Sequence, residues 1–211
     1  MIRQEMIRTE MTVAMVQCAI IVLLAGPCAA AGPSLGYEFV GQVLNPSATQ
    51  SIQYGYLNSI AGLDTVATQS GAVSEATALL TFYNDTATQL VINNGPIRVI
   101  DRTGSSTIYF NAAGGGDFTN ADTFRAGKPV QTCTLRHQVV IDTSTGYFTA
   151  SFEMTITSAR VFQVNGAGYL LGRPGEVYHW NVYGKLTTQG PPAAQIAGFA
   201  TGSRAAMIST D

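Results

Sequence analysis

The chain has 211 residues, of which 46% are hydrophobic and only 11% are charged, and its formal net charge is −2. A charged fraction so far below the usual quarter excludes a coiled coil, an ordinary helical bundle and a charge-rich disordered chain. The slightly acidic balance lacks the basic surface of a nucleic-acid-binding protein, so we expect no nucleic-acid partner. Nine Tyr and nine Phe, with abundant Thr, indicate β-strands instead.

The first 31 residues have the pattern of a secretory signal peptide. A short segment with two arginines precedes an apolar run over residues 11–26, which is too short for a membrane span of about 20 residues. Ala29 and Ala31 then form an A-x-A cleavage site before Gly32. We therefore expect residues 1–31 to be removed and the mature chain to be secreted or periplasmic, with no membrane span of its own.

Two features of this N-terminal segment leave alternatives open. Met6, Met11 and Met15 are other candidate start sites, because acidic residues interrupt the segment that should be basic. Cys28 raises the alternative of a lipoprotein anchor. Pro27 disfavours it, because a small residue normally stands directly before an acylated cysteine.

The cysteines give no covalent framework to the mature chain. Cys18 and Cys28 fall in the expected signal peptide, so only Cys133 remains and no internal disulfide can form. About 180 residues suffice for one apolar core without such crosslinks. Neither a zinc-type cluster of Cys and His nor a cofactor motif is present, and we expect no cofactor.

From Gly36 to about Gln189 the sequence alternates short β-type runs with turn signals, and no helical stripe persists for three turns. In chain order the runs are 37–44, 52–60, 76–84, 89–92, 97–102, 105–112, 129–142, 147–160 and 178–186. Residues 101–104 are interpreted as a tight turn, and 142–146 as the clearest hairpin turn in the chain. The segment 190–211 loses the period and is expected to be a flexible tail or a short helix.

The two longest runs alternate strictly between apolar and polar residues, which is typical of antiparallel strands with one dry face. We therefore predict one all-β domain over residues 32–189, with eight or nine antiparallel strands in a closed or partly open barrel. A two-sheet sandwich or jelly roll is the alternative. Runs of this length favour the barrel, since tilted barrel strands are long. A transmembrane barrel would usually need more strands.

His137 is the most distinctive candidate functional residue, because period-two counting places it on the apolar face with Cys133, Leu135 and Val139. Inside a barrel it could act as a general acid or base, or hydrogen-bond to a ligand. The alternative is a buried histidine that only satisfies a neighbouring carbonyl. Cys133 lies about 13 Å away along an extended strand, too far to be activated as a nucleophile.

Aromatic side chains provide the other candidate ligand contacts. Tyr54 and Tyr56 share one face of their predicted strand, and Trp180 lies on the apolar face of the last one. If these faces line a barrel, its interior suits a small apolar ligand, because such pockets are mostly hydrophobic with few polar groups.

A glycine-rich stretch contains the only candidate metal ligands, which are Asp117, Asn120 and Asp122. Their oxygens are closely spaced, as in calcium loops, but the order and the distal Glu of an EF-hand are missing. Asp and Asn also form turns by bonding to nearby backbone. We therefore expect no metal at this loop.

Two classes of function remain open. The first is a non-catalytic extracytoplasmic domain that binds a small apolar ligand or has a structural role. The second is a barrel isomerase or cyclase that shapes a hydrophobic substrate and uses a single His or Tyr for proton transfer. A cavity that contains His137 beside a carboxylate would favour the enzyme. The sequence gives no indication of the oligomeric state.

Overall fold

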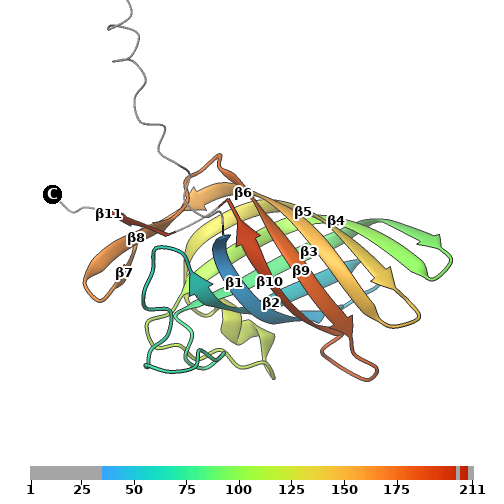
Figure 1. The fold of residues 1–211 in the computed structure, drawn as a ribbon, viewed down its shortest axis with the longest axis horizontal. Helices are drawn as coiled ribbons and strands as arrows, with labels where there is room; N and C mark the ends of the chain where they lie inside the picture. The colour runs from blue at the N-terminus through green and yellow to red at the C-terminus, as the bar shows by residue number, and fades with distance from the viewer. Residues whose placement is uncertain (1–34, 203–204, 209–211) are drawn as a thin grey trace, which may run out of the picture. The chain divides into compact units, whose positions relative to one another are not determined.

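A computed structural model describes residues 35–202 and 205–208 of the chain, with the side chain of Leu35 excepted. The expected signal peptide and the alternative anchor at Cys28 lie outside the described residues. Eight strands form a closed antiparallel barrel in the order β1-β10-β9-β6-β5-β4-β3-β2 (Figure 1). This confirms the all-β barrel predicted from the sequence. The barrel strands are β1 (Leu35–Leu44), β2 (Gln50–Ile60), β3 (Leu80–Asn94), β4 (Ile97–Phe110), β5 (Lys128–Asp142), β6 (Tyr147–Ala159), β9 (Val177–Leu186) and β10 (Ala194–Thr201).

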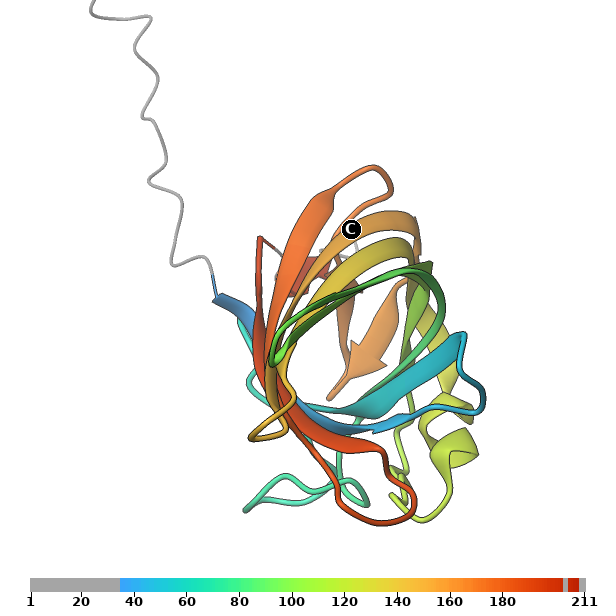
Figure 2. The same ribbon diagram turned by 90° about the vertical axis from the view of Figure 1, so that its right-hand side faces the viewer.

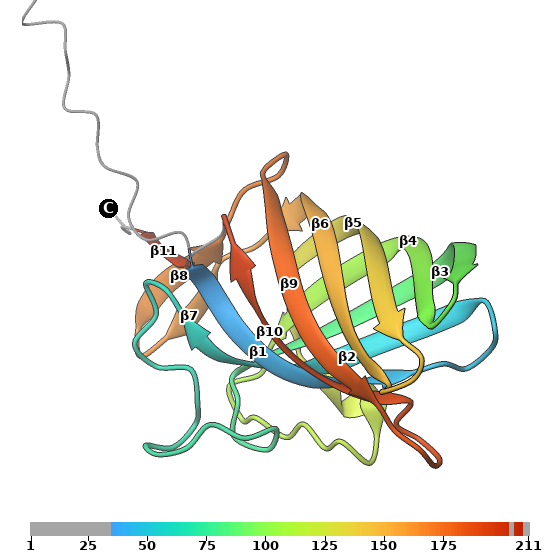
Figure 3. The ribbon, with the colours of Figure 1, turned by 45° about the vertical axis from the view of Figure 1, so that its right-hand side comes forward.

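The barrel is wound by hairpins, so each strand pairs with the barrel strands that precede and follow it in the chain, and β10 closes the ring against β1. The strands run obliquely around the barrel, as Figure 3 shows. Between β6 and β9 the chain forms two short strands outside the barrel, β7 (Phe162–Val164) and β8 (Ala167–Leu171). These two strands and β11 (Ala205–Ile208) make a separate three-stranded sheet.

The segment 190–211 corrects the sequence expectation of a flexible tail. Its residues Ala194–Thr201 form β10, which pairs along its whole length with β9 and with β1. The residues of β10 that face the barrel interior are small or aliphatic, and Gly198 is one of them. A Cβ atom at Gly198 would lie 2.9 Å from the Phe39 ring. The strand is therefore specified by what it packs against and not by its own β-propensity.

The interpretation of residues 101–104 as a turn is also wrong. These residues lie in the middle of β4. The hairpin turn between β3 and β4 falls at Gly95-Pro96, within the break that the sequence predicts between the runs 89–92 and 97–102. Gly104 is required for a different reason, since a Cβ atom there would collide with the backbone carbonyl oxygen of Asp85 on β3. Glycine thus allows two strands to approach closely and does not mark a turn.

Aromatic side chains fill the middle of the barrel. Trp180 on β9 is 1% exposed, and its ring centroid lies 4.3 Å from that of Phe39 and 5.0 Å from that of Phe82. The Trp180 indole N–H donates a hydrogen bond of 2.8 Å to the hydroxyl of Tyr37. We call Tyr37, Phe39, Phe82, Phe152 and Trp180 the aromatic plug. One of its members, Phe152, lines the cavity described below.

The connection from β4 to β5 covers part of the outer barrel surface. It contains a short 3-10 helix, η1 (Ala121–Arg125), whose Phe124 is fully buried. The Thr81 hydroxyl on β3 donates a hydrogen bond of 2.7 Å to the backbone carbonyl of Phe124. Both faces of β2 and β3 are therefore covered over part of their length. In the part of the chain that the structure describes, no helix is long and apolar enough to cross a membrane.

Candidate ligand pocket inside the barrel

A cavity of about 210 Å³ lies inside the barrel at the end formed by four hairpin turns, and Figure 2 views the ring of strands from this end. These turns join β1 to β2, β3 to β4, β5 to β6, and β9 to β10. Phe152 of the aromatic plug lines the cavity. At ~30 Å³ per water molecule the space corresponds to about seven waters, or to an organic molecule of similar size.

Apolar side chains form most of the cavity wall, and they come mainly from β5, β6, β9 and β10. The larger apolar residues on these four strands are Val139, Ile141, Phe148, Phe152, Val182, Leu186 and Ile196, and Val43 on β1 and Ile100 on β4 add to them. Alternation brings them together, because every second residue of a barrel strand faces inward. Ala150 lies between Phe148 and Phe152 on β6 and leaves room that a larger side chain would occupy.

The polar residues of the cavity lie on the other side, on β2, β4 and β5 and in the β1–β2 turn. They are Asn45, Ser51, Gln53, Arg98, Arg102 and His137. No Asp or Glu is among the lining residues. The cavity is therefore amphipathic, and its only formal charges are those of the two guanidinium groups.

His137 projects from β5 into the barrel, as period-two counting predicts, and it is 5% exposed. Its Nε2 atom lies 3.3 Å from Nη1 of Arg102. Because a guanidinium group can only donate, Nε2 must accept this bond and the proton of the neutral ring must reside on Nδ1. The buried Nδ1 atom has no hydrogen-bond partner among the described residues.

Burial and the Arg102 charge together lower the pKa of His137 from 6.5 to about 3, with burial the larger cause. The imidazole is therefore neutral at physiological pH. Its ring also packs edge-on against Phe152 at a centroid distance of 4.3 Å. These contacts fix both the orientation and the protonation state of the histidine.

Arg102 is half-buried on β4, and its Nε atom donates a hydrogen bond of 3.2 Å to the hydroxyl of Thr88. Burial lowers the pKa of Arg102, although an arginine remains protonated at physiological pH. No carboxylate of the described residues is within ion-pair distance of this guanidinium. Arg102 thus carries a charge that no acidic side chain balances within the cavity.

Further polar atoms of the inner wall also lack partners. Three of the residues that carry these atoms are neighbours in the strand register. Asn84 on β3 lies opposite Gln53 on β2 and opposite Ser106 on β4, and all three side chains are buried. The Gln53 side-chain oxygen, both amide atoms of Asn84 and the Ser106 hydroxyl have no hydrogen-bond partner within the described part of the chain. Of these three residues only Gln53 lines the cavity, so its side-chain oxygen is the unpaired atom that a bound molecule could satisfy.

Sequence reasoning missed Arg102, Arg98 and Gln53 as site residues. The signal was present in β4, where Arg98, Ile100 and Arg102 alternate on one face. The assumed turn at residues 101–104 interrupted that count.

The predicted aromatic ligand contacts fall in two places, and neither is the cavity. Trp180 is in the aromatic plug and does not line the cavity. Tyr54 and Tyr56 lie on the outer face of β2, where both rings lie against Phe118 of the β4–β5 connection. The Tyr54 hydroxyl donates a hydrogen bond of 2.9 Å to the Gln42 side-chain oxygen. Only His137 among the candidates therefore lines the pocket.

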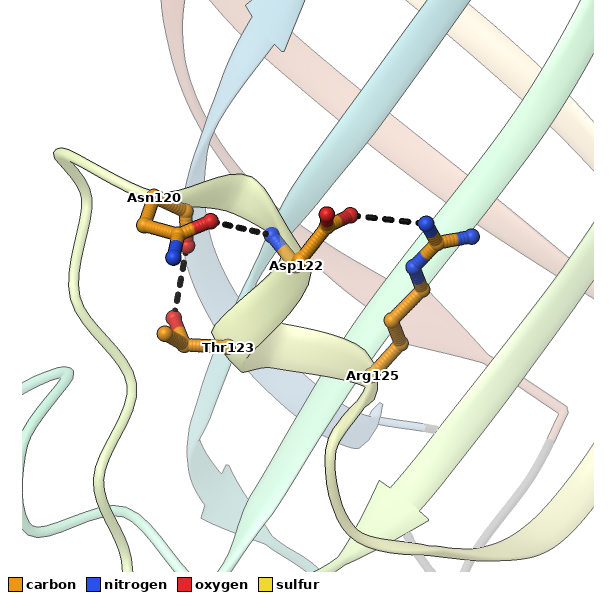
Figure 4. A network of polar contacts seen from close by, with 4 residues as sticks. All are labelled: Asn120, Asp122, Thr123 and Arg125. Atoms are coloured by element: carbon orange, nitrogen blue, oxygen red, sulfur yellow. Dashed lines mark hydrogen bonds and ion pairs between the residues drawn. The ribbon is translucent and has the colours of Figure 1, made fainter.

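The predicted metal-ligand residues form turn contacts on the outside of the barrel, and Figure 4 shows those of Asn120 and Asp122. Asp117 accepts hydrogen bonds from the backbone N–H and the hydroxyl of Thr119, at 2.8 and 2.7 Å. Asn120 accepts from the backbone N–H of Asp122 and so caps η1, and Asp122 forms an ion pair of 2.8 Å with Arg125. Across the described ranges, no three His, Cys, Asp or Glu residues are placed to hold a metal.

Cys133 is buried on the other side of the plug from the cavity, with its sulfur 3.6 Å from the Tyr178 hydroxyl. Burial raises the pKa of this thiol to about 11, so it stays protonated and unreactive at neutral pH.

No protein-family model matches the chain, and no curated protein or solved structure is significantly similar to it. What can be inferred about function therefore comes from the pocket itself.

Proposed function

We propose that the protein is a non-catalytic binding protein whose barrel holds one small, largely apolar molecule. The observation that carries this proposal is the cavity of about 210 Å³, with its apolar wall and its few polar groups on one side. Small-molecule sites in proteins typically have this composition, and they are often found in the mouths of β-barrels.

The surroundings of His137 favour binding over proton transfer. A general base works best when its pKa is close to the operating pH, whereas the pKa of His137 is lowered to about 3. Its ring nitrogen accepts from Arg102, and no Asp or Glu lines the cavity to assist a proton transfer. These features make a barrel isomerase or cyclase the weaker of the two candidate functions.

We also propose that the domain acts outside the cytoplasm. The support is the signal-peptide pattern over residues 1–31, with its cleavage site before Gly32. Protein purified from its source organism is expected to begin at Gly32, as measured by intact-mass spectrometry. A chain that retains residues 1–31, or one that carries a lipid on Cys28, would overturn this proposal.

The binding function is tested with 1-octanol, a neutral molecule with an apolar chain, titrated into the protein by calorimetry. The variant Ala150→Phe fills the cavity from β6 and is expected to weaken octanol binding by about tenfold or more, because the ring occupies space that the ligand needs. The matched control is Thr149→Phe, the neighbouring exposed residue on the same strand, whose side chain points outward.

Equal octanol affinities for the wild type and Ala150→Phe would place binding elsewhere and contradict the proposal. Circular dichroism and thermal unfolding of both variants show whether the barrel is intact. An intact Thr149→Phe variant should bind octanol as the wild type does.

A further inference from the structure

Arg102 lies where two hollows of the barrel meet. The interior cavity and a second hollow of about 240 Å³ at the barrel mouth share four lining residues, Asn45, Arg98, Ile100 and Arg102. The second hollow also reaches Gln50 at the start of β2. A ligand in the apolar cavity would therefore have one end beside Arg102, facing the mouth.

The charge at this junction is uncompensated. Neither hollow is lined by an Asp or Glu, and neither arginine is in an ion pair with any described residue. A neighbouring hollow that Arg102 also lines does contain two acidic residues, Asp101 and Glu153, but neither is within ion-pair distance of Arg102. Asp85 accepts from the Gln50 side chain at 2.9 Å, and Asp101 accepts from the Gln138 side chain at 3.0 Å.

The side chains around Arg102 leave its charge available. The hydroxyl of Thr88 and the neutral ring of His137 each accept one hydrogen bond from the guanidinium, and neither contributes a negative charge. A guanidinium group has five N–H donors, so further donors remain for a ligand. Its planar geometry matches carboxylate and phosphate groups, which it often binds through two parallel hydrogen bonds.

Resting on the proposed binding function, we infer that the natural ligand is a small amphipathic anion. Its carboxylate or phosphate group lies against Arg102, and its apolar body lies among Phe148, Val182 and Ile196. Arg98, which is exposed at the mouth, adds positive charge along the entry path. The partly dry surroundings of Arg102 strengthen this pairing relative to one in open water.

Calorimetric titrations at pH 7.5 with octanoate, octyl phosphate and 1-octanol test the inference, since the three probes share one chain and differ in the head group. At least one of the two anions is expected to bind about tenfold more tightly than octanol, the effect of one charge-assisted hydrogen bond. In Arg102→Gln the ratio of anion to octanol affinity should fall to about one. In Arg136→Gln, an exposed outward residue on β5, the ratio should remain that of the wild type.

Octanol binding as tightly as both anions would overturn the inference and leave the binding function intact, whereas failure of all three probes to bind would overturn both. The preferred anion shows whether the head group is a carboxylate or a phosphate. If Arg102→Gln does not fold, Arg102→Lys serves instead, because it keeps the charge and loses the planar fork. If the ratio of anion to octanol affinity in Arg102→Lys equals that of the wild type and does not change with salt concentration, the guanidinium has no role in binding the anion.

Discussion

Replacing Trp180 by alanine should lower the free energy of unfolding by about 3–5 kcal/mol, the usual cost of deleting a large buried aromatic side chain. Trp180 is 1% exposed and packs against Phe39, Phe82 and Phe152. The substitution also leaves the Tyr37 hydroxyl without its indole donor inside the barrel. Both effects act on the same buried cluster, which adjoins the pocket.

Urea unfolding followed by far-ultraviolet circular dichroism measures this loss, because Trp180 is the only tryptophan and its fluorescence disappears with it. His179→Ala is the matched control, since it truncates the neighbouring outward residue of β9 and should cost less than about 1 kcal/mol. A loss of under about 1 kcal/mol for Trp180→Ala would show that the plug does not hold the barrel together.

His137 is expected to make the protein less stable as the pH falls from about 6.5 to about 3. In the unfolded chain this histidine binds a proton near its ordinary pKa of 6.5, whereas in the folded barrel burial and Arg102 lower its pKa to about 3. Acid therefore favours the unfolded state across this window. The full effect is on the order of 5 kcal/mol, reached below about pH 3, and stability is unaffected by this group above pH 7.

Acid also acts on proteins through groups other than histidine, so the measurement compares variants with the wild type. Unfolding free energies of the wild type and His137→Gln are determined between pH 4 and 7.5, and the wild type should lose more stability on acidification. His179→Gln removes the other histidine, which is exposed, and should follow the wild-type curve. Parallel curves for the wild type and His137→Gln would mean that His137 takes up a proton in the folded barrel as readily as in the unfolded chain.

The alternation of apolar and polar residues predicts the barrel strands well where one face of a strand is exposed to solvent. Strands β5 and β6 alternate between buried and exposed residues along most of their length, and the turn between them falls at 142–146 as predicted. Strand β10 escapes prediction because Gly198 and its Ala neighbours carry little β-propensity. The small size of Gly198 is instead required by the ring of Phe39, its direct partner on the adjacent strand β1.

The same reasoning explains which site residues could be predicted. His137 is identified because its neighbours at every second position are apolar and its strand has one covered face. On β2 the pattern is ambiguous, since the β4–β5 connection covers the outer face and buries Tyr54 there. Period-two counting then cannot distinguish the inner face from the outer one. Contacts between Arg102 and His137 arise only from the pairing of β4 with β5.

The most direct test of the central claim, that the barrel interior is a ligand pocket, is a nuclear magnetic resonance titration of the ¹⁵N-labelled protein with octanoate. The pocket predicts saturable shift changes that are largest for the amides of Ala150 and Val182 and for the side-chain Nε of Arg102, with little change at Phe124 in the outer connection. No saturable change at the pocket residues, or changes centred on the outer connection, would contradict it.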